Sequence, residues 1–220
     1  MNTSVAPPSA TAAGRSSPGA VESALGSVQG PDQTTWERVH GDLLRRADAE
    51  GLVDVAFERH DTPLGSIFVG ATDAGLVRIG LPAEDEDAVL DELARRVSPR
   101  VLRAPRDTVT RARHQLDRYF AGALRAFDVA LDWRLTAGFR RRVLFATARI
   151  PYGLTSSYRE LATQAGSPAA VRAAGTALAT NPLPIVVPCH RVLRSGGQLG
   201  QYRGGSEAKA RLLELERTAV

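Results

Sequence analysis

The chain contains a single cysteine, Cys189, which limits how its fold can be held together. One thiol cannot form an internal disulfide, and it cannot supply a Cys-x-x-Cys redox or zinc motif. Cys189 is therefore either an inert core residue or an activated nucleophile. The adjacent His190 favours the nucleophile, because histidine exchanges a proton near neutral pH and only the thiolate is reactive.

Composition bounds the class of protein. The chain has 220 residues, of which 43% are hydrophobic and 24% charged, values that suit one large or two small globular domains. No apolar run is long enough to cross a bilayer, and the N-terminus lacks the pattern of a secretory signal. We therefore expect a cytoplasmic protein with no membrane partner, a location that also fits an unpaired thiol. We also expect the protein to be a monomer.

Charge is unevenly distributed along the chain. Residues 133–220 carry thirteen Lys/Arg and four acidic residues, whereas residues 1–132 have a net charge of −5. This asymmetry suggests a polyanionic partner, most simply nucleic acid. A solvated, arginine-rich surface is the alternative explanation.

The N-terminal part predicts three segments. Residues 1–33 are rich in Ala, Ser, Pro and Gly, which predicts a disordered tail. Residues 34–51 have the apolar spacing of a helix, with Trp36, Val39 and Leu43 on one face together with Leu44 and Ala47. Residues 52–132 predict an α+β domain without a catalytic cluster, whose His60 and His114 we expect to be structural or surface residues. Its predicted strands are 53–59, 66–71, 76–81 and 127–131, and its predicted helices are 84–97 and 108–120.

Residues 133–220 predict a helical domain. Ser157 and Glu160 have the spacing of a capping box, which predicts a helix beginning at Tyr158. Ser167 followed by Pro168 predicts the start of a second helix that runs to about Ala179. Two short helices joined by a glycine turn are typical of a helix-turn-helix. Further helices are predicted at 138–149 and 206–217.

Two features of this domain allow alternatives. The second helix of the pair consists almost wholly of small residues apart from Arg172, so it is either buried against neighbours or able to enter a DNA groove. Glu216 shares the apolar stripe of the last helix with Leu212 and needs a partner if it is buried. His190 is the candidate partner, and a solvated Glu216 is the alternative.

The motif Pro188-Cys189-His190-Arg191, preceded by Ile185-Val186-Val187, resembles the active-site signature of the methylated-DNA–protein-cysteine methyltransferases. The resemblance covers roughly residues 54–217. Further matching segments occur in the expected order: Thr62-Pro63-Leu64-Gly65, Tyr119-Phe120-Ala121-Gly122, Ile150-Pro151-Tyr152-Gly153, Ser157-Tyr158, Asn181-Pro182 and Tyr202-Arg203-Gly204-Gly205.

The resemblance implies an α+β protein in which a ribonuclease-H-like N-terminal α/β domain precedes a helical, winged-helix-like DNA-binding domain with a helix-turn-helix. It also implies DNA repair without cofactor or metal. The alkyl group of O6-alkylguanine, and the methyl group of O4-methylthymine, would pass from double-stranded DNA to Cys189 in one irreversible event per molecule. The helix-turn-helix would occupy the minor groove, and the damaged nucleotide would be flipped out of the stack.

The resemblance assigns roles to individual residues. Cys189 is the acceptor, His190 removes its proton through a bridging water, and Glu216 orients the histidine. Asn181 fixes the active-site turn, and Tyr158 helps to rotate the nucleotide and donates a proton to the leaving guanine. The implied DNA-binding residues are Arg172, which fills the gap left by the flipped base, and Tyr158, Arg159, Ser167, Ala170 and Ser195. The implied base pocket is formed by Tyr202, Arg203, Gly204, Val187 and Pro184.

The chain also departs from the family pattern, at Arg140, Leu144, Leu154 and Arg203. These changes bear on rate and substrate range more than on the chemistry. Two other functions are open: a non-reactive alkyltransferase-like protein that binds DNA lesions, and a cysteine hydrolase that uses Cys189, His190 and Glu216. The first normally lacks the cysteine, and adjacent Cys and His are not typical of the second.

Overall fold

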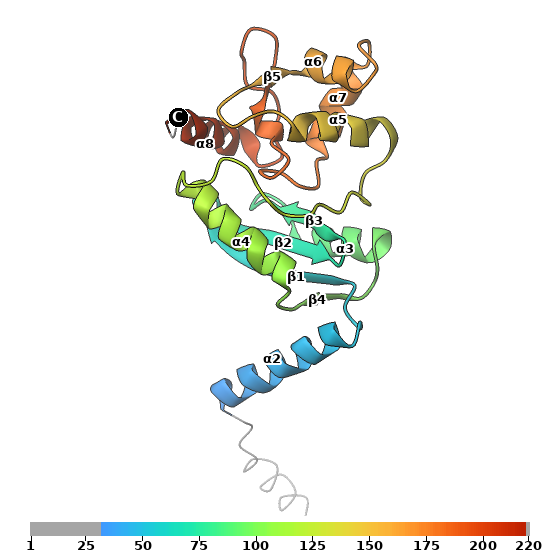
Figure 1. The fold of residues 1–220 in the computed structure, drawn as a ribbon, viewed down its shortest axis with the longest axis vertical. Helices are drawn as coiled ribbons and strands as arrows, with labels where there is room; N and C mark the ends of the chain where they lie inside the picture. Colours follow the sequence, from blue (N-terminus) through green and yellow to red (C-terminus); the bar gives the residue numbers. More distant parts are fainter. Residues whose placement is uncertain (1–31, 219–220) are drawn as a thin grey trace, which may run out of the picture. The chain divides into compact units, whose positions relative to one another are not determined.

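The computed structural model describes residues 32–218 of the chain (Figure 1). The predicted disordered tail lies outside the described residues apart from Asp32 and Gln33. Asp32 opens the first helix, because its carboxylate accepts a hydrogen bond from the Thr35 backbone N–H at 2.8 Å. This helix, α2, spans Gln33–Ala49.

The predicted apolar face of α2 is only partly used. Leu44 and Ala47 pack against a small cluster of Val53, Ala56 and Ala104. Trp36, Val39 and Leu43 instead expose more than half of their surface, so the shared stripe does not bury them.

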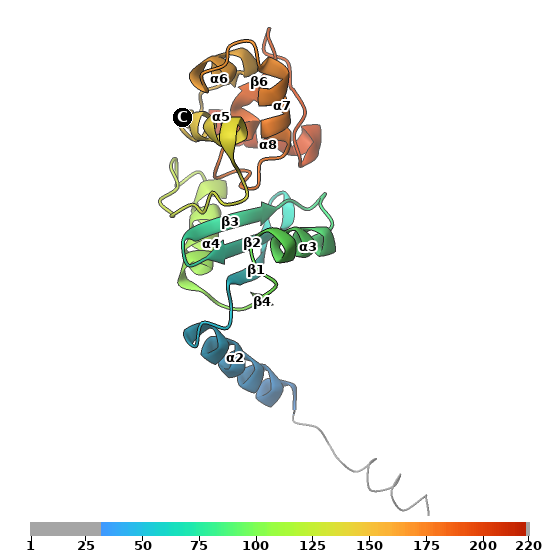
Figure 2. The same cartoon turned by 90° about the vertical axis from the view of Figure 1, so that its right-hand side faces the viewer.

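A four-stranded sheet follows, with strand order β3-β2-β1-β4. Neighbours β1, β2 and β3 are antiparallel, and β4 pairs parallel to β1. Ile67, Val69 and Ala71 share a cluster with one helix, α4, whereas the intervening Phe68 shares a cluster with the other, α3. The sheet is therefore covered on both faces, as Figure 2 shows. The elements are β1 (Val55–Thr62), β2 (Gly65–Thr72), β3 (Gly75–Gly80), α3 (Glu86–Arg96), β4 (Val101–Arg103) and α4 (Asp107–Phe120).

The predicted strand at 127–131 is wrong. This segment forms only an isolated bridge between Leu131 and Leu76, and Phe127 and Val129 pack as loop residues against the core. The fourth strand is instead β4, which was not predicted because three residues are too short to show an alternating pattern.

The helical half begins after residues 121–137, which follow α4 and which we call the linker. The capping box of Ser157 and Glu160 is present as predicted, with the Ser157 backbone N–H donating to Glu160 at 2.7 Å. The predicted helix start at Pro168 is wrong: a turn bond from the Ala170 N–H to the Ser167 carbonyl at 2.9 Å delays the helix, and Ser167 does not cap it. The elements are α5 (Gly138–Ala148), β5 (Ser156–Ser157), α6 (Tyr158–Gln164), α7 (Val171–Ala179), η1 (Cys189–Arg191), β6 (Val192–Leu193) and α8 (Gly205–Thr218).

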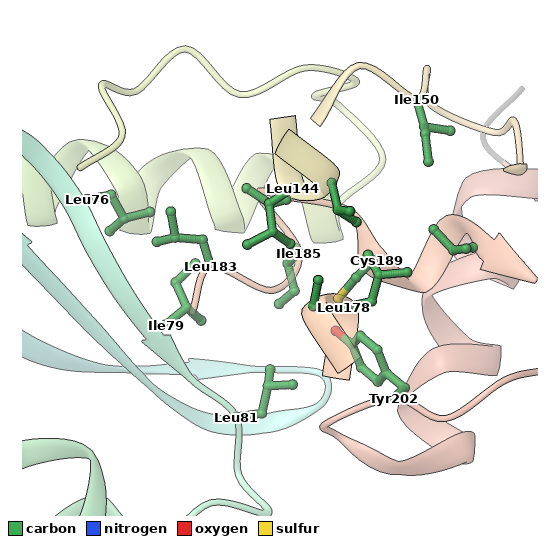
Figure 3. Packing of buried hydrophobic residues seen from close by; sticks show 14 of the residues in the cluster. Leu76, Ile79, Leu81, Leu144, Ile150, Leu178, Leu183, Ile185, Cys189 and Tyr202 are labelled. Atoms are coloured by element: carbon green, nitrogen blue, oxygen red, sulfur yellow. The ribbon is translucent and has the colours of Figure 1, made fainter. Parts of the chain in front are cut away.

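One hydrophobic cluster joins the sheet to the helical half (Figure 3). Leu76 and Ile79 of β3 belong to the same cluster as Leu144 of α5 and the loop residues Leu183 and Ile185. All five side chains are fully buried. This cluster also includes Cys189, so the cysteine and the sheet share one core. None of the helices within residues 32–218 combines the length and apolar character that a membrane span requires.

Gly75 marks the closest approach of the linker to the sheet. Its φ of 139° lies in a region that side chains rarely adopt, and an added Cβ would lie 2.4 Å from the Ala130 carbonyl oxygen. Backbone bonds of 2.8 Å join Leu76 to Ala130 and to Asp132 at this point. The linker can therefore pair with β3 only because residue 75 has no side chain.

We expect Gly75→Ala to destabilise the protein by about 2–4 kcal/mol, because backbone strain and a steric clash add. Gly166→Ala is the matched control, since Gly166 also has a positive φ (78°) but nothing within 4 Å of its added Cβ. It should cost about 1 kcal/mol. Urea unfolding measures both, and equal losses would contradict the proposed clash.

Candidate active site

The loop that carries Cys189 is buried and tightly folded. Backbone bonds of 2.8 Å join the Val187 N–H to the Leu183 carbonyl and the Cys189 N–H to the Val187 carbonyl. Ile185 has a φ of 73°, a strained conformation for a β-branched residue, which costs on the order of 1–3 kcal/mol. Its side chain is fully buried, so core packing holds the strained backbone in place.

Asn181 holds the thiol. Its side-chain Nδ2 donates to Cys189 Sγ at 3.2 Å and to the Val187 carbonyl at 2.8 Å, and its Oδ1 accepts from the Leu183 N–H at 3.0 Å. Asn181 is only 1% exposed, and both its Nδ2 and its Oδ1 therefore form hydrogen bonds within one loop. These three bonds join Asn181 to the turn before the cysteine, and the role of fixing that turn stays a prediction.

Glu216 is the polar centre of the site. Its carboxylate accepts from the Tyr119 hydroxyl at 2.6 Å and pairs with His190 Nε2 at 2.9 Å. Arg191 donates two bonds of 2.8 Å, and the Gly153 N–H donates one of 3.2 Å. Burial acts to raise the pKa of Glu216, but the hydrogen bonds from His190 and Arg191 prevail and lower it to about 2. The alternative of a solvated Glu216 is excluded, since this side chain is 1% exposed.

His190 is prepared to accept a proton. Burial lowers its pKa, against the raising effect of the hydrogen bond to Glu216, so the imidazole is neutral at pH 7. A carboxylate can only accept, so Nε2 carries the proton and Nδ1 has a free lone pair. Nδ1 is buried and has no hydrogen-bond partner among the described residues. His190 and Glu216 thus have the geometry of a general base and the carboxylate that orients it.

The resting thiol is protonated at neutral pH. Burial raises the pKa of Cys189 to about 11, whereas the hydrogen bond from Asn181 and the charges of Lys209 and Arg203 act to lower it. Lys209 was not predicted from the sequence. It is fully buried, and its Nζ donates to the Val192 carbonyl at 2.5 Å. The available signal was spacing, because Lys209 lies on the same helical stripe as Leu212 and Glu216.

A cavity of about 620 Å³ lies beside the helix pair α6–α7. It brings together four predicted DNA-binding residues, Tyr158, Arg159, Arg172 and Ser195. Ser167 and Ala170 are not among its lining residues. An additional cation, Arg194, lines the wall but was not predicted, because a single arginine near a glycine turn carries no distinctive pattern.

The predicted base-pocket residues are only partly assembled. Tyr202 and Arg203 line an adjoining cavity of about 540 Å³, which shares Arg194 with the first. Gly204 does not line it, and Val187 and Pro184 are buried behind it in the loop. The Tyr202 ring packs edge-on against His190, with 6.4 Å between the ring centroids.

Gly200 leaves room for the Tyr158 hydroxyl. An added Cβ at position 200 would lie 2.1 Å from that oxygen, so only glycine allows this position of the tyrosine. Burial raises the pKa of Tyr158, so its phenol is protonated at neutral pH. Among residues 32–218 no group of three or more His, Cys, Asp or Glu side chains is arranged to hold a metal ion.

We expect Glu216→Gln to lower the free energy of unfolding by about 3 kcal/mol at pH 7, because it removes the charge that pairs with buried Arg191 and His190. The folded pKa of Glu216 is below its unfolded value, so this stabilisation is present above about pH 4.5 and is lost as the pH falls toward 2. Denaturant unfolding at pH 7 and pH 3 should therefore show a smaller difference at the lower pH. Glu214→Gln, on the exposed face of the same helix, should leave the stability nearly unchanged at either pH.

Both halves of the chain match family models. Residues 49–133 match the 6-O-methylguanine DNA methyltransferase, ribonuclease-like domain, and residues 138–218 match the DNA binding domain of the same family. The M. tuberculosis H37Rv methylated-DNA–protein-cysteine methyltransferase is 53% identical over 104 residues, which cover 47% of this chain and 62% of that protein. This alignment therefore spans less than two thirds of the relative.

Two longer matches cover most of their counterparts. The constitutive methylated-DNA–protein-cysteine methyltransferase of Bacillus subtilis is 37% identical over 161 residues, or 71% of this chain and 92% of that protein. The crystal structure of M. tuberculosis OGT in complex with DNA is similar with a TM-score of 0.65 at 36% identity, covering 75% of this chain and 94% of that one. A mixed α+β fold, a buried Cys–His–Glu site and two matching family models lead to one conclusion: the chain belongs to the methylated-DNA–protein-cysteine methyltransferase family.

Proposed function

We propose that this protein repairs DNA by transferring the alkyl group of O6-alkylguanine, and the methyl group of O4-methylthymine, from double-stranded DNA to Cys189. The observations that carry the proposal are the buried pairs Asn181–Cys189 and His190–Glu216, together with a cavity beside α6–α7 that Arg159, Arg172 and Arg194 line. No cofactor or metal takes part in the proposed reaction, and the protein acts as a monomer.

The proposed reaction is a single displacement. A water bridges the thiol to His190 Nδ1, which takes the proton while Glu216 stabilises the imidazolium. Sulfur then forms a bond to the alkyl carbon as the bond from that carbon to guanine O6 breaks. The leaving guanine takes a proton from the Tyr158 hydroxyl, and the Tyr158 phenolate regains a proton through solvent as the His190 imidazolium releases the one it took from the thiol. The thioether that remains on Cys189 is stable. Each molecule therefore reacts once.

The high pKa of the resting thiol fits this scheme. A protonated, 5% exposed cysteine reacts poorly with other electrophiles. Deprotonation would follow the entry of a base into the pocket lined by Tyr202 and Arg203. Reactivity is then limited to the bound lesion.

DNA would be held by the helix-turn-helix α6–α7. Helix α7 presents small residues and an exposed Arg172, so its backbone can approach the minor groove closely. The O6 atom is inaccessible within the base stack, so the nucleotide must be flipped, and Arg172 takes its place. Arg159, Ser195 and Arg194 lie where phosphates would pass, and Ser167 and Ala170 would lie at the edge of the interface. The DNA complex of the M. tuberculosis relative supports a DNA partner.

The finer fold assignment also belongs to this proposal. The strand order β3-β2-β1-β4, with a parallel fourth strand, supports a ribonuclease-H-like domain at residues 52–132. The short parallel pair of β5 and β6 beside the helix pair supports a winged-helix-like domain at residues 133–220.

The central test is intact-mass spectrometry after mixing the protein with a duplex that carries one O6-methylguanine. We expect the mass to rise by one methylene on Cys189 and the reaction to stop at one lesion per protein. Cys189→Ala should bind the duplex but gain no mass. Repair of many lesions per molecule would indicate a hydrolase, and binding without any mass gain would indicate a non-reactive lesion-binding protein.

Arg172→Ala should weaken binding to the lesion duplex about tenfold and slow transfer, because a group that fills the duplex gap is lost. Arg95→Ala is the control, since Arg95 is an exposed cation on α3 of the sheet domain. Fluorescence anisotropy at several salt concentrations measures binding, which should weaken steeply with salt for the wild type. Equal affinities of the two variants would remove the role assigned to Arg172.

A further inference from the structure

Three successive backbone carbonyls before the cysteine loop are each held by a different part of the molecule. We call residues 180–182 the active-site turn. The Thr180 carbonyl accepts from Arg140 Nη2 of α5, and the Asn181 carbonyl accepts from Arg203 Nη1 at 3.3 Å. The Pro182 carbonyl accepts from the Ile79 N–H of β3 at 2.8 Å. The active-site turn is thus hydrogen-bonded to α5, to the sheet and to the loop that carries Tyr202 and Arg203, which we call the pocket loop.

These ties act on the residue that contacts the thiol. The Asn181 amide reaches Cys189 Sγ at 3.2 Å, and a short side chain can hold that distance only if its backbone is fixed. Hydrogen bonds to the peptide groups on both sides of Asn181 fix the two planes that set the direction of its side chain. A small rotation of this backbone would separate the amide from the sulfur.

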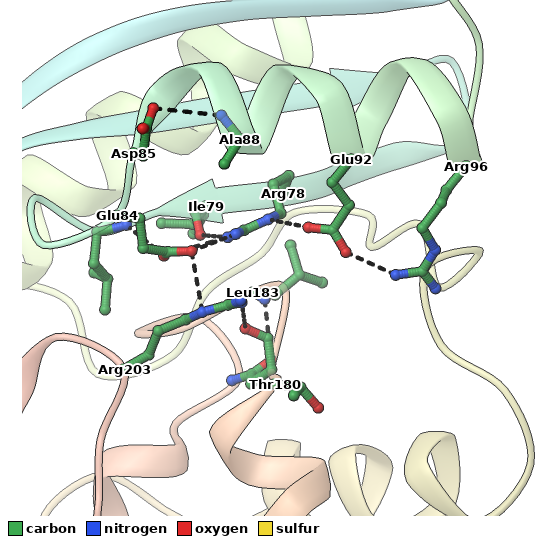
Figure 4. Close-up of polar contacts among 12 residues, drawn as sticks. Arg78, Ile79, Glu84, Asp85, Ala88, Glu92, Arg96, Thr180, Leu183 and Arg203 are labelled. Atoms are coloured by element: carbon green, nitrogen blue, oxygen red, sulfur yellow. Dashed lines mark hydrogen bonds and ion pairs between the residues drawn. The ribbon is translucent and has the colours of Figure 1, made fainter.

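Arg203 is itself firmly placed. Its Nε pairs with Glu84 at 3.0 Å, and Glu84 pairs with the fully buried Arg78 at 2.5 Å (Figure 4). Arg78 in turn pairs with Glu92 at 3.2 Å. The guanidinium of Arg203 therefore reaches from the pocket loop to acidic groups that flank the sheet, and contacts the active-site turn on the way.

Arg140 is placed differently, in surroundings that disfavour its charge. Within residues 32–218 it has no ion pair, and its buried Nε has no hydrogen-bond partner. Burial and the nearby Arg96 lower its pKa, only partly opposed by Glu92. The interaction that the half-buried guanidinium does make is its bond to the Thr180 carbonyl. A cation kept in such surroundings without a carboxylate partner points to a role in holding that carbonyl.

We propose that Arg140 is a positioning residue for alkyl transfer: by holding the Thr180 carbonyl, together with Arg203 and the Ile79 backbone, it keeps the Asn181 amide on the Cys189 thiol. Arg140 does not touch the sulfur and acts through Asn181. The inference rests on the proposed function, because transfer is the process that the positioned thiol serves.

The next residue on α5 provides a matched control. Arg141 is also half-buried and also donates only to backbone carbonyls, those of Trp133 and Thr136, at 3.1 Å and 3.0 Å. These carbonyls belong to the linker and not to the active-site turn. Arg140→Met and Arg141→Met therefore remove the same charge and the same kind of bond from one helix but release different segments. Arg141 loses three such bonds and Arg140 loses one, so a purely structural effect would be larger for Arg141→Met.

The first measurement is the single-turnover rate constant for transfer from an O6-methylguanine duplex at saturating DNA. We expect Arg140→Met to lower it about tenfold with little change in the DNA concentration for half-saturation, because the thiol is misplaced while the DNA surface is intact. Arg141→Met should leave both values unchanged, and Arg140→Lys should restore part of the rate. Equal effects of the two methionine variants, or none, would overturn the inference.

A double-mutant cycle tests the route of the effect. If Arg140 acts through the amide, Arg140→Met should cause no further loss of rate in an Asn181→Ala background, whereas independent effects would multiply. Multiplied effects would refute the assigned route even if the single variants behave as expected.

A second measurement is independent of transfer. In the ¹⁵N-labelled resting protein, the Asn181 side-chain amide resonance, assigned by its loss in Asn181→Ala, should shift in Arg140→Met and not in Arg141→Met. If the wild type transfers no alkyl group, the proposed function fails while this shift still tests the positioning role. If transfer occurs but neither rate nor resonance responds to Arg140→Met, the inference alone fails.

Discussion

The carboxylate of Glu216 is the interaction on which the site depends. It accepts hydrogen bonds from α4 through Tyr119, from the loop before the helix pair through Gly153, and from η1 through His190 and Arg191. Because it is buried, each donor offsets part of the cost of desolvating the charge, and loss of any one leaves the others poorly balanced. One side chain of the last helix thus connects the sheet domain, the helical domain and the imidazole of His190.

A second feature of the site is that the groups around the Cys189 thiol are already in place while the thiol is still protonated. The thiol is buried and protonated at rest, yet Asn181, Lys209 and Arg203 all act to stabilise its charged form. The strained Ile185 and the bonds to the active-site turn hold this arrangement before any substrate arrives. Preorganisation of this kind means that little reorganisation is needed when the proton leaves.

The sheet domain contributes to this preorganisation without supplying a catalytic group. It provides Tyr119 to Glu216, the Ile79 backbone to Pro182, and Glu84 to Arg203. Together with the shared hydrophobic cluster, these contacts make the domain a rigid support for the loop that carries Cys189. The sheet domain therefore has a structural role beside the site, although it supplies no catalytic residue.

The sequence alone determined the local features and the chemistry. Short apolar runs between turn residues located β1, β2 and β3, the Ser157–Glu160 spacing located the start of α6, and the ordered motifs around Cys189 identified the family. Short-range signals misplaced the start of α7 and predicted a strand at 127–131, because turn bonds and linker packing decided those segments. Only the tertiary structure showed Lys209 beside the thiol, Arg140 on the active-site turn and Tyr119 on Glu216. Tyr119 and Glu216 are 97 residues apart, and a hydrogen bond over such a separation leaves no periodic trace in the sequence, since the fold brings its partners together.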